Sequence, residues 1–211
     1  MAGSGWDDVD RDALAILRPL LDAGGYLPWS EWALRPAALA AVCNEIVLAG
    51  RREIVELGSG VSTVVLGRLL GQRGGRLSSV EHDPAWSGVV RGLLETDGIG
   101  DAVRLIEAPL EPHPSALDGA HWYSEAALAA LPDEIDLLLV DGPPGNDEGI
   151  ERSRFPALPL LHPWLAAAGT VVLDDARRPG EQAILERWGA DHPEWNFSTR
   201  AEGIAIAVRS G

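Results

Sequence analysis

Five short apolar runs, each followed by a longer segment, constrain the fold of this chain more than any other feature. The runs are EIVEL (53–57), LSSVE (77–81), VRLIEA (103–108), IDLLLVD (135–141) and TVVLDD (170–175). Parallel strands need a crossover of a dozen or more residues, usually a helix, and the segments between these runs are long enough for one. The spacing therefore predicts an α/β fold in which helices cover a parallel sheet.

Helix-forming patterns precede and connect these runs. Leucines recur at helical spacing from Asp7 to Leu21, and AALAAVCNEIVLAG is a strongly helical run that ends at Gly50. Asp83 before Pro84 predicts a helix start, because aspartate caps helix N-termini and proline fits the first helical turn. We also expect PALPLLHPWLAAAG to form helical turns that lead into the fifth strand.

The end of the chain follows a different pattern. WNFSTRAEGIAIAVR contains two strand-like runs separated only by a short Ala-Glu-Gly turn. Such a turn leaves no room for a crossover helix, so the two runs are expected to form an antiparallel hairpin. A parallel sheet that ends in a hairpin departs from the all-parallel nucleotide-binding folds.

Composition excludes several classes of function. The chain has 211 residues, enough for one compact domain, and a formal net charge of −15, which disfavours nucleic acid and anionic membranes as partners. All 17 basic side chains counted as lysine or arginine are arginine, so a lysine base is excluded. The single cysteine, Cys43, allows no internal disulfide. Without an apolar run of membrane-spanning length or a signal-peptide pattern, we expect a soluble cytoplasmic protein.

The stretch IVELGSGVST (54–63) is a candidate ligand-binding turn. Gly58 and Gly60 follow the first apolar run, where glycines let backbone approach a ligand and the next helix offers unpaired N–H groups. Ser62 and Thr63 stand where a dinucleotide-binding fingerprint has its third glycine, so that fingerprint is incomplete. The turn gives only a weak indication of NAD.

Two glutamates narrow the choice of ligand. Glu56 lies within the first run, and a carboxylate there suits a ligand with a positive ammonium better than a pyrophosphate. Glu81 ends the second run about twenty residues after the glycines, where a carboxylate can accept hydrogen bonds from both ribose hydroxyls. Each glutamate alone is also compatible with a solvated loop, but the combination favours a nucleoside-like ligand with a cationic group.

Four motifs resemble those of class I S-adenosylmethionine-dependent methyltransferases: VELGSGVST, VEHDPAW, IDLLLVDGPPG and GTVVLDDA. The resemblance covers residues 29–209. It implies a Rossmann-like α/β fold with a seven-stranded sheet in the order 3-2-1-4-5-7-6, strand 7 antiparallel, and helices on both faces. It also implies a single methyltransferase domain over residues 1–211, in which 1–50 form an N-terminal helical extension and substrate lid and 51–211 form the cofactor-binding core.

The resemblance further implies a set of cofactor contacts. Residues of the glycine turn would surround the methionine part, Glu81 would hold the ribose and His82 would lie against the adenine. The segment after the third run would close over the adenine edge, and Asp141 would face the methyl donor. His82 as a surface residue and VDGPPG as a simple tight turn remain alternatives. The implied contacts are Glu56, Gly58, Ser59, Gly60, Ser62, Thr63, Glu81, His82, Ala108, Pro109, Leu110 and Asp141.

Catalytic candidates come from the fourth run and the loop before it. A hydroxyl nucleophile usually needs its proton removed or its charge stabilised, and His113, His121, Tyr123 and Asp141 are the candidate groups. Packing of the Trp122–Tyr123 pair is the alternative to a catalytic role for Tyr123.

The aspartates that end the fourth and fifth runs suggest a metal site. Asp141, Asp174 and Asp175 are expected to meet at one sheet edge, and clustered carboxylate oxygens suit Mg²⁺. Metal-dependent small-molecule O-methyltransferases place acids at the corresponding strand ends. The chain departs from them because DGPPG replaces their aspartate-rich loop, Asp175 replaces their asparagine and their lysine base has no counterpart. The alternative is that Asp174 and Asp175 cap a helix that begins near Arg178.

These observations together predict an S-adenosylmethionine-dependent methyltransferase that acts on a small molecule, most readily at an oxygen. The aromatic segment YLPWSEWALRP, with Tyr26, Trp29 and Trp32, is expected to cover the substrate or to pack on the sheet. The alternatives are an NAD(P)-dependent oxidoreductase and a non-catalytic cofactor-binding partner subunit. A homodimer is compatible with either enzymatic interpretation.

Overall fold

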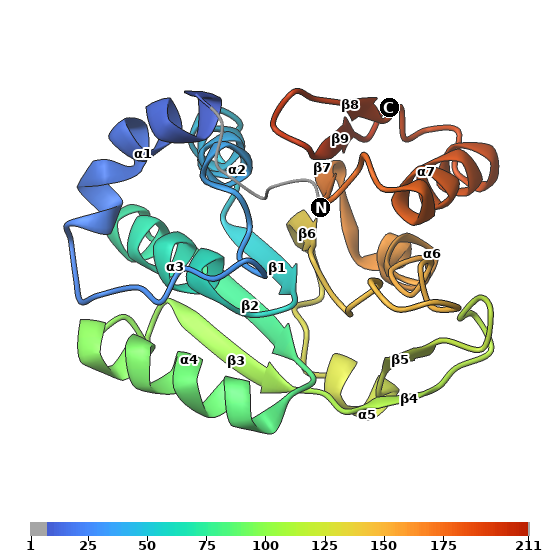
Figure 1. Ribbon diagram of the computed structural model, residues 1–211, viewed down its shortest axis with the longest axis horizontal. Helices are drawn as coiled ribbons and strands as arrows, with labels where there is room; N and C mark the ends of the chain where they lie inside the picture. Colours follow the sequence, from blue (N-terminus) through green and yellow to red (C-terminus); the bar gives the residue numbers. More distant parts are fainter. Residues whose placement is uncertain (1–7, 211) are drawn as a thin grey trace.

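A seven-stranded sheet organises the protein, whose computed structural model describes residues 8–210 (Figure 1). The strand order is β3-β2-β1-β6-β7-β9-β8. The first five strands in this order run parallel, and β9 is antiparallel to both of its neighbours. The strands of this sheet are β1 (Glu53–Leu57), β2 (Arg76–Glu81), β3 (Val103–Glu107), β6 (Ile135–Val140), β7 (Leu165–Leu173), β8 (Ser198–Thr199) and β9 (Ala205–Val208).

Helices cover both faces of the sheet. In Figure 1, α1 to α4 lie on one side and α5 to α7 on the other. Strand side chains alternate between the two resulting cores: Ile54 packs with α1 to α4, whereas its neighbour Val55 packs with α6 and α7. The helices are α1 (Asp8–Leu21), α2 (Pro36–Leu48), α3 (Val61–Arg73), α4 (Pro84–Asp97), α5 (Glu125–Leu128), α6 (Ala157–Leu161), the 3₁₀ helix η1 (His162–Trp164) and α7 (Pro179–Asp191).

The predicted topology is confirmed. With β6 to β9 as the fourth to seventh strands of the large sheet, the expected order 3-2-1-4-5-7-6 is the observed one. The closing hairpin is β8 and β9, joined by the predicted turn. Asp83 caps α4, because its side chain accepts hydrogen bonds from the amides of Ala85 and Trp86. The first helix is described from Asp8, so the predicted start at Asp7 lies outside the described residues.

One predicted helix is wrong in part. The residues LAAAG (165–169) belong to β7, although their alanines favour a helix. Leu165 is buried and pairs with Ile135, and the register shifts between Ile135 and Leu137. Sheet pairing at an irregular position therefore outweighs local helix propensity here.

The loop expected before β6 takes part in a second, two-stranded sheet. β4 (Leu110–Pro112) pairs antiparallel with β5 (His121–Tyr123). Trp122 and Tyr123 are 0% and 1% exposed and pack edge to face, with ring centroids 5.1 Å apart. Burial of these two aromatic rings explains why this segment folds back on the main core.

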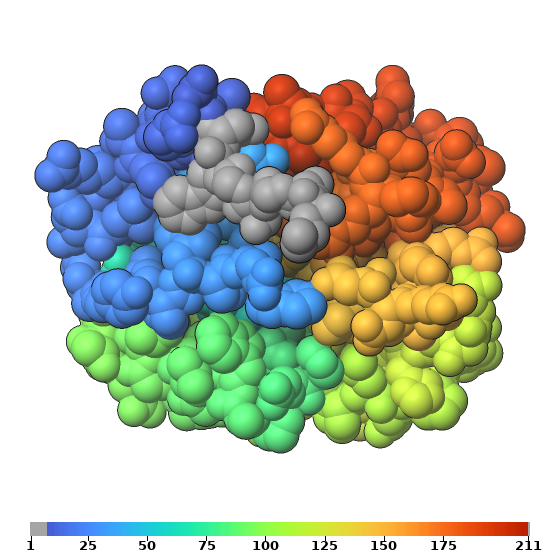
Figure 2. All heavy atoms as spheres, in the orientation of Figure 1, coloured from blue at the N-terminus to red at the C-terminus, as the bar shows by residue number. Residues whose placement is uncertain are grey.

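The N-terminal region is attached to the core by a buried ion pair. Arg68 of α3 bonds to Asp97 of α4, with Nε to Oδ2 at 2.7 Å, and also donates to the carbonyls of Leu20, Leu21 and Gly25. In Figure 2 the stretch after α1 forms a blue band between α1 and the green α4. Across residues 8–210, no helix has both the length and the apolar character needed to cross a membrane.

Candidate active site

The carboxyl ends of four neighbouring strands place four of the predicted site residues in one row. Leu57, Val80, Val140 and Leu173 are register partners across β2, β1, β6 and β7. The next residues along these strands are Gly58, Glu81, Asp141 and Asp174. Ligands of open α/β sheets bind at this edge, so the row marks the candidate active site.

The glycine turn comes close to the turn that follows β6. Gly58 has φ +90°, and a Cβ built on it would lie 3.0 Å from the amide nitrogen of Gly142. The carbonyl of Leu57 accepts hydrogen bonds from the amides of Asp141 and Gly142, at 3.0 and 2.7 Å. Both the positive φ and this close approach require glycine at position 58.

Glu56 anchors the glycine turn from inside the protein. It is 0% exposed, and its carboxylate accepts hydrogen bonds from Ser62, Thr63 and Ser79 at 2.5, 2.5 and 2.6 Å. Burial raises the pKa of Glu56, although the three hydroxyl donors oppose that shift. These bonds join β1 to the start of α3 and to β2. The predicted contact of Glu56 with a ligand ammonium stays a prediction.

Glu81 is held by the turn that it faces. Its Oε2 accepts from the amide and hydroxyl of Ser59 at 3.0 and 2.7 Å, and its Oε1 accepts from the amides of His82 and Asp83 at 2.8 Å. His82 Nδ1 lies 3.0 Å from Oε1. Burial favours a raised pKa, but bonds from His82, Asp83 and Ser59 outweigh it and lower the pKa of Glu81. The carboxylate is therefore ionised at neutral pH.

The segment after β3, for which the resemblance implies adenine contacts, lies beside Glu81. The amide of Ala108 donates to the carbonyl of Glu81 at 2.7 Å, and Ala108 itself is buried. The carbonyl of Pro109 accepts from Ser124, and Leu110 begins β4. This position is compatible with the predicted adenine contacts, which stay predictions.

Asp141, Asp174 and Asp175 form one cluster, as the sequence predicts. Their carboxylates can offer ligand oxygens that all lie within 4.8 Å of one another. Burial raises the pKa of Asp141 to about 6, against the lowering effect of Arg154. Burial and the neighbouring charges of Asp141 and Asp175 raise the pKa of Asp174 well above its ordinary value.

Arg154 and Glu181 lie beside the three aspartates, and neither was predicted from the sequence. Arg154, whose side chain is 5% exposed, lies 3.5 Å from Asp141, 3.1 Å from Asp175 and 3.5 Å from Glu181. Its sequence context, ERSRFPALPLL, contains no recognisable motif, and Glu181 lies in the first turn of α7. A charged residue next to a strongly apolar run was the only indication that Arg154 is buried.

The donor set of this cluster fits a divalent cation. Glu181 Oε1 is buried and makes no hydrogen bond within the described part of the chain. Four carboxylates face two guanidinium groups, those of Arg154 and Arg178, the latter 2.9 Å from Asp175. Burial is the main cause of the raised pKa values of Asp141 and Asp174, and the neighbouring carboxylate charges add to it. Carboxylate oxygens in such a group are ligands that Mg²⁺ prefers. The alternative that these aspartates cap α7 is not supported, since Arg178 occupies the N-cap position.

The surroundings of Tyr123 favour packing over a role as a base, which stays a prediction. Its hydroxyl is buried without a hydrogen-bond partner in residues 8–210 and lies 2.5 Å from a Cβ built on Gly142. Burial raises its pKa well above 10, which opposes loss of the proton. Packing with Trp122 is the better interpretation. His121 is exposed at the opposite end of β5 from Tyr123, paired with Pro112, and its catalytic role stays a prediction.

Comparison with known proteins agrees with this geometry. A family described as a methyltransferase domain matches residues 55–176, more than half of the chain. Curated protein sequences gave no match. An SAH-bound methyltransferase from Podospora anserina is 16% identical with a TM-score of 0.63, and the match covers 100% of this chain and 91% of the other. An O-methyltransferase from Bacillus cereus in complex with SAH is 18% identical with a TM-score of 0.62, covering 99% and 94%.

A third similar structure comes from Streptomyces achromogenes. The O-methyltransferase from Streptomyces achromogenes involved in tomaymycin synthesis, in complex with SAM, is 17% identical with a TM-score of 0.61, and the match covers 98% of this chain and 92% of the other. At these identities the likeness shows the fold, while the family match covers the glycine turn, Glu81, the β6 end and both β7 aspartates. The chain therefore belongs to this methyltransferase-domain family, with the Rossmann-like fold of the class I S-adenosylmethionine-dependent methyltransferases.

Proposed function

We propose that this protein transfers a methyl group from S-adenosylmethionine to an oxygen of a small-molecule acceptor. The observation that carries the proposal is the pair formed by the glycine turn and Glu81. The ionised Glu81 carboxylate lies at the end of β2, in hydrogen-bond contact with Ser59 of the turn. Ribose hydroxyls would replace the Ser59 hydroxyl as donors to this carboxylate.

The chain's contribution to the reaction is chiefly positioning. As the acceptor oxygen bonds to the methyl carbon, the carbon–sulfur bond breaks, S-adenosylhomocysteine leaves and the acceptor proton passes to a base or to solvent. Holding the two reactants in line contributes on the order of 7 to 11 kcal/mol to such a step. In our proposal the turn at Gly58 to Gly60 and Glu81 hold the donor, and Asp141 lies beside the reacting groups because it ends the adjacent strand β6.

We further propose that the aspartate cluster holds Mg²⁺. Asp141, Asp174 and Asp175 would be its ligands, and Arg154 would stay beside them as a fixed positive charge. When bound, Mg²⁺ supplies a Lewis acid that polarises an acceptor hydroxyl and makes its proton easier to remove. The similarity to O-methyltransferases from Bacillus cereus and Streptomyces achromogenes supports oxygen as the acceptor atom.

Calorimetric titration tests the cofactor. We expect S-adenosylhomocysteine to bind with one site per chain and NADH to give no heat of binding beyond dilution. Both glycines of the turn and Glu81 are shared by the two ligand classes, so only a direct comparison separates them. Binding of NADH alone would overturn the proposal in favour of an oxidoreductase.

Manganese binding tests the metal without requiring knowledge of the acceptor. We expect the paramagnetic resonance of free Mn²⁺ to fall when protein is added, and Mg²⁺ to restore it by competition. Asp174→Asn should abolish the part of the effect that Mg²⁺ reverses, whereas Asp118→Asn, which changes an exposed aspartate paired with Arg152, should leave it intact. Equal Mn²⁺ binding by both variants would remove the metal from this cluster. In an active preparation, undiminished turnover in EDTA would show that catalysis needs no metal.

A further inference from the structure

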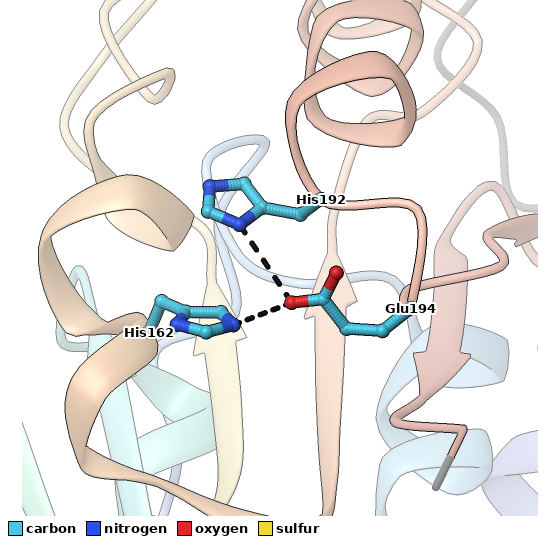
Figure 3. A group of neighbouring side chains, drawn as sticks. All are labelled: His162, His192 and Glu194. Carbon is cyan, nitrogen blue, oxygen red and sulfur yellow. Dashed lines mark hydrogen bonds and ion pairs between the residues drawn. The ribbon is translucent and has the colours of Figure 1, made fainter.

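A second group of possible metal ligands lies at the opposite edge of the sheet from the aspartate cluster. His162 belongs to η1, just before β7, and His192 and Glu194 follow α7. The aspartates follow the carboxyl end of β7, whereas η1 leads into its amino end. Figure 3 shows the three side chains converging from the two segments on one carboxylate oxygen. None of them takes part in the proposed methyl transfer.

The three side chains lie closer together than the one hydrogen bond between His162 and Glu194 would require. His162 Nε2 lies 2.6 Å from Glu194 Oε1, which is a hydrogen bond. His192 Nδ1 points at the same oxygen from 3.8 Å, too far for a hydrogen bond. The two imidazole rings stack with centroids 4.8 Å apart, and the three ligand atoms lie within 4.8 Å of one another.

The three side chains are accessible but not freely solvated. His162, His192 and Glu194 have 22%, 21% and 29% of their side-chain surface exposed. The buried ring of Trp195 packs edge-on against His162, with ring centroids 6.5 Å apart, and so restricts movement of the His162 ring. An ion can therefore reach the ligand atoms from solvent while the surrounding residues limit their movement.

We propose that His162, His192 and Glu194 form a binding site for a divalent transition metal, with Zn²⁺ as the preferred ion. Two imidazole nitrogens and one carboxylate oxygen are a ligand set that Zn²⁺ accepts, with water as the fourth ligand. Mg²⁺ prefers oxygen ligands only, so this site and the aspartate cluster select different metals.

The required rearrangement is small. Metal–ligand distances of about 2.0 to 2.1 Å in a tetrahedral site separate neighbouring ligand atoms by about 3.3 Å. His162 and Glu194 would therefore move apart from 2.6 Å, and His192 would approach from 3.8 Å.

A bound ion would join two parts of the chain that are distant in sequence. His162 leads into β7, and Glu194 precedes Trp195, which forms a β-bridge with Arg209 after β9. The ion would therefore fasten η1 to the connection between α7 and the terminal hairpin. We infer a structural role for this metal, separate from methyl transfer.

Zinc titration of the untagged full-length protein tests the site. In the presence of excess Mg²⁺, which occupies oxygen-only sites, we expect one equivalent of Zn²⁺ to bind and to raise the melting temperature. His192→Ala and Glu194→Gln should each weaken Zn²⁺ binding by more than about tenfold. His113→Ala is the matched control, because His113 also pairs with a glutamate, at 3.0 Å from Glu125, and should bind Zn²⁺ like the unchanged protein.

A spectroscopic measurement separates loss of ligands from loss of fold. Co²⁺ in a tetrahedral nitrogen and oxygen site gives visible absorption, which we expect for the unchanged protein and not for Glu194→Gln. Melting of each variant without metal checks that it is folded. Equal Zn²⁺ affinity in all variants, or a Co²⁺ spectrum unaffected by Glu194→Gln, would overturn the proposal.

Discussion

At the scale of single residues, the candidate site depends on which carboxylates are buried and what donates to them. Glu56 and Glu81 lie on neighbouring strands, yet their environments differ. Three hydroxyl groups surround Glu56, whose pKa burial raises, whereas backbone amides and His82 surround Glu81, whose pKa is lowered. Because of this contrast, we infer that Glu56 holds the turn and that the ionised Glu81 is the group available to the proposed cofactor.

Glu81→Gln is expected to weaken binding of S-adenosylhomocysteine by about 1.5 to 3 kcal/mol, on the order of a 10- to 100-fold loss of affinity, because charged hydrogen bonds to ribose are lost. Calorimetry measures it. Glu107→Gln is the control, because Glu107 is the register partner of Glu81 on β3 but bonds to Ser87 and Arg91. If both variants bind equally well, Glu81 is not a ribose ligand.

The Glu81–His82 pair should make stability depend on pH. The hydrogen bond with Glu81 raises the pKa of His82 above its usual 6.5, so its contribution is complete below 6.5 and is lost as pH rises through the raised value. The lowered pKa of Glu81 adds a contribution that is present above 4.5 and lost on further acidification.

His82→Asn should therefore lower the melting temperature most between pH 4.5 and 6.5 and least above pH 8. Thermal melts of the unchanged protein and of His82→Asn from pH 4.5 to pH 9 measure the difference in melting temperature. If His82→Asn lowers the melting temperature by the same amount from pH 5 to pH 9, the charged pair does not have the proposed role.

Sequence spacing predicted Glu81, Asp141 and the β7 aspartates because each directly follows or ends an apolar run. Arg154 could not be predicted in this way, since it reaches the site from a loop and its position depends on how that loop folds. The burial of Tyr123 could not be predicted for a related reason: sequence alone does not show whether an aromatic hydroxyl is buried.

At the scale of elements, the glycine turn combines two requirements that can be separated. Gly58 has a positive φ and a crowded Cβ position, whereas a Cβ on Gly60 would meet nothing within 4 Å. Gly58 is therefore needed by the fold. Gly60 leaves open space at the start of α3, where a ligand would approach the helix N-terminus.

Gly58→Ala is expected to lower the free energy of unfolding, by about 1 to 3 kcal/mol for the strained backbone alone. Gly60→Ala should leave stability nearly unchanged but weaken S-adenosylhomocysteine binding, because the added methyl group fills the space for the ligand. Urea unfolding and calorimetry of both variants measure these effects. Full affinity in Gly60→Ala would place the ligand elsewhere.

Element boundaries were predictable where burial and local propensity agree. β1 coincides with the predicted run at 53–57, and α4 starts at the predicted proline. They were not predictable where the two conflict, as in the alanine-rich start of β7, or where two short strands pair only with each other, as in β4 and β5.

At the scale of the whole molecule, the N-terminal region and the core are joined by the buried Arg68–Asp97 pair. Asp97 is 4% and Arg68 2% exposed at the side chain, and Asp97 also accepts from the amide of Gly25 at 2.8 Å. The aromatic segment that was expected to cover the substrate begins at Tyr26, directly after Gly25. Its aromatic side chains differ: Tyr26 is 86% and Trp32 67% exposed, whereas Trp29 packs against the core.

Asp97→Ala is expected to destabilise the protein by about 3 to 5 kcal/mol, because it leaves the Arg68 guanidinium buried without its counter-charge. Asp22→Ala, which breaks an exposed pair with Arg18, should cost at most about 1 kcal/mol. Urea unfolding measures both, and limited proteolysis should cut residues 22–35 faster in Asp97→Ala. Equal stability of the two variants would show that the Arg68–Asp97 pair contributes little to the free energy of unfolding.

The overall topology was the most predictable level, because run lengths and spacings dictate parallel pairing and the short final turn dictates a hairpin. The contacts that attach the N-terminal region to the core could not be predicted, since Arg68 and Asp97 lie 29 residues apart on two different helices.

The register of the sheet also determines where the chain can tolerate changes of length. Gly58, Glu81, Asp141 and Asp174 each stand one residue beyond a paired row. One residue inserted within β6 would turn the side chains after it to the opposite face and carry Asp141 out of line with Glu81 and Asp174. The same insertion in the surface loop after Pro144 would leave the row intact. Related chains should therefore differ in loop length at this edge while keeping the strands before it constant.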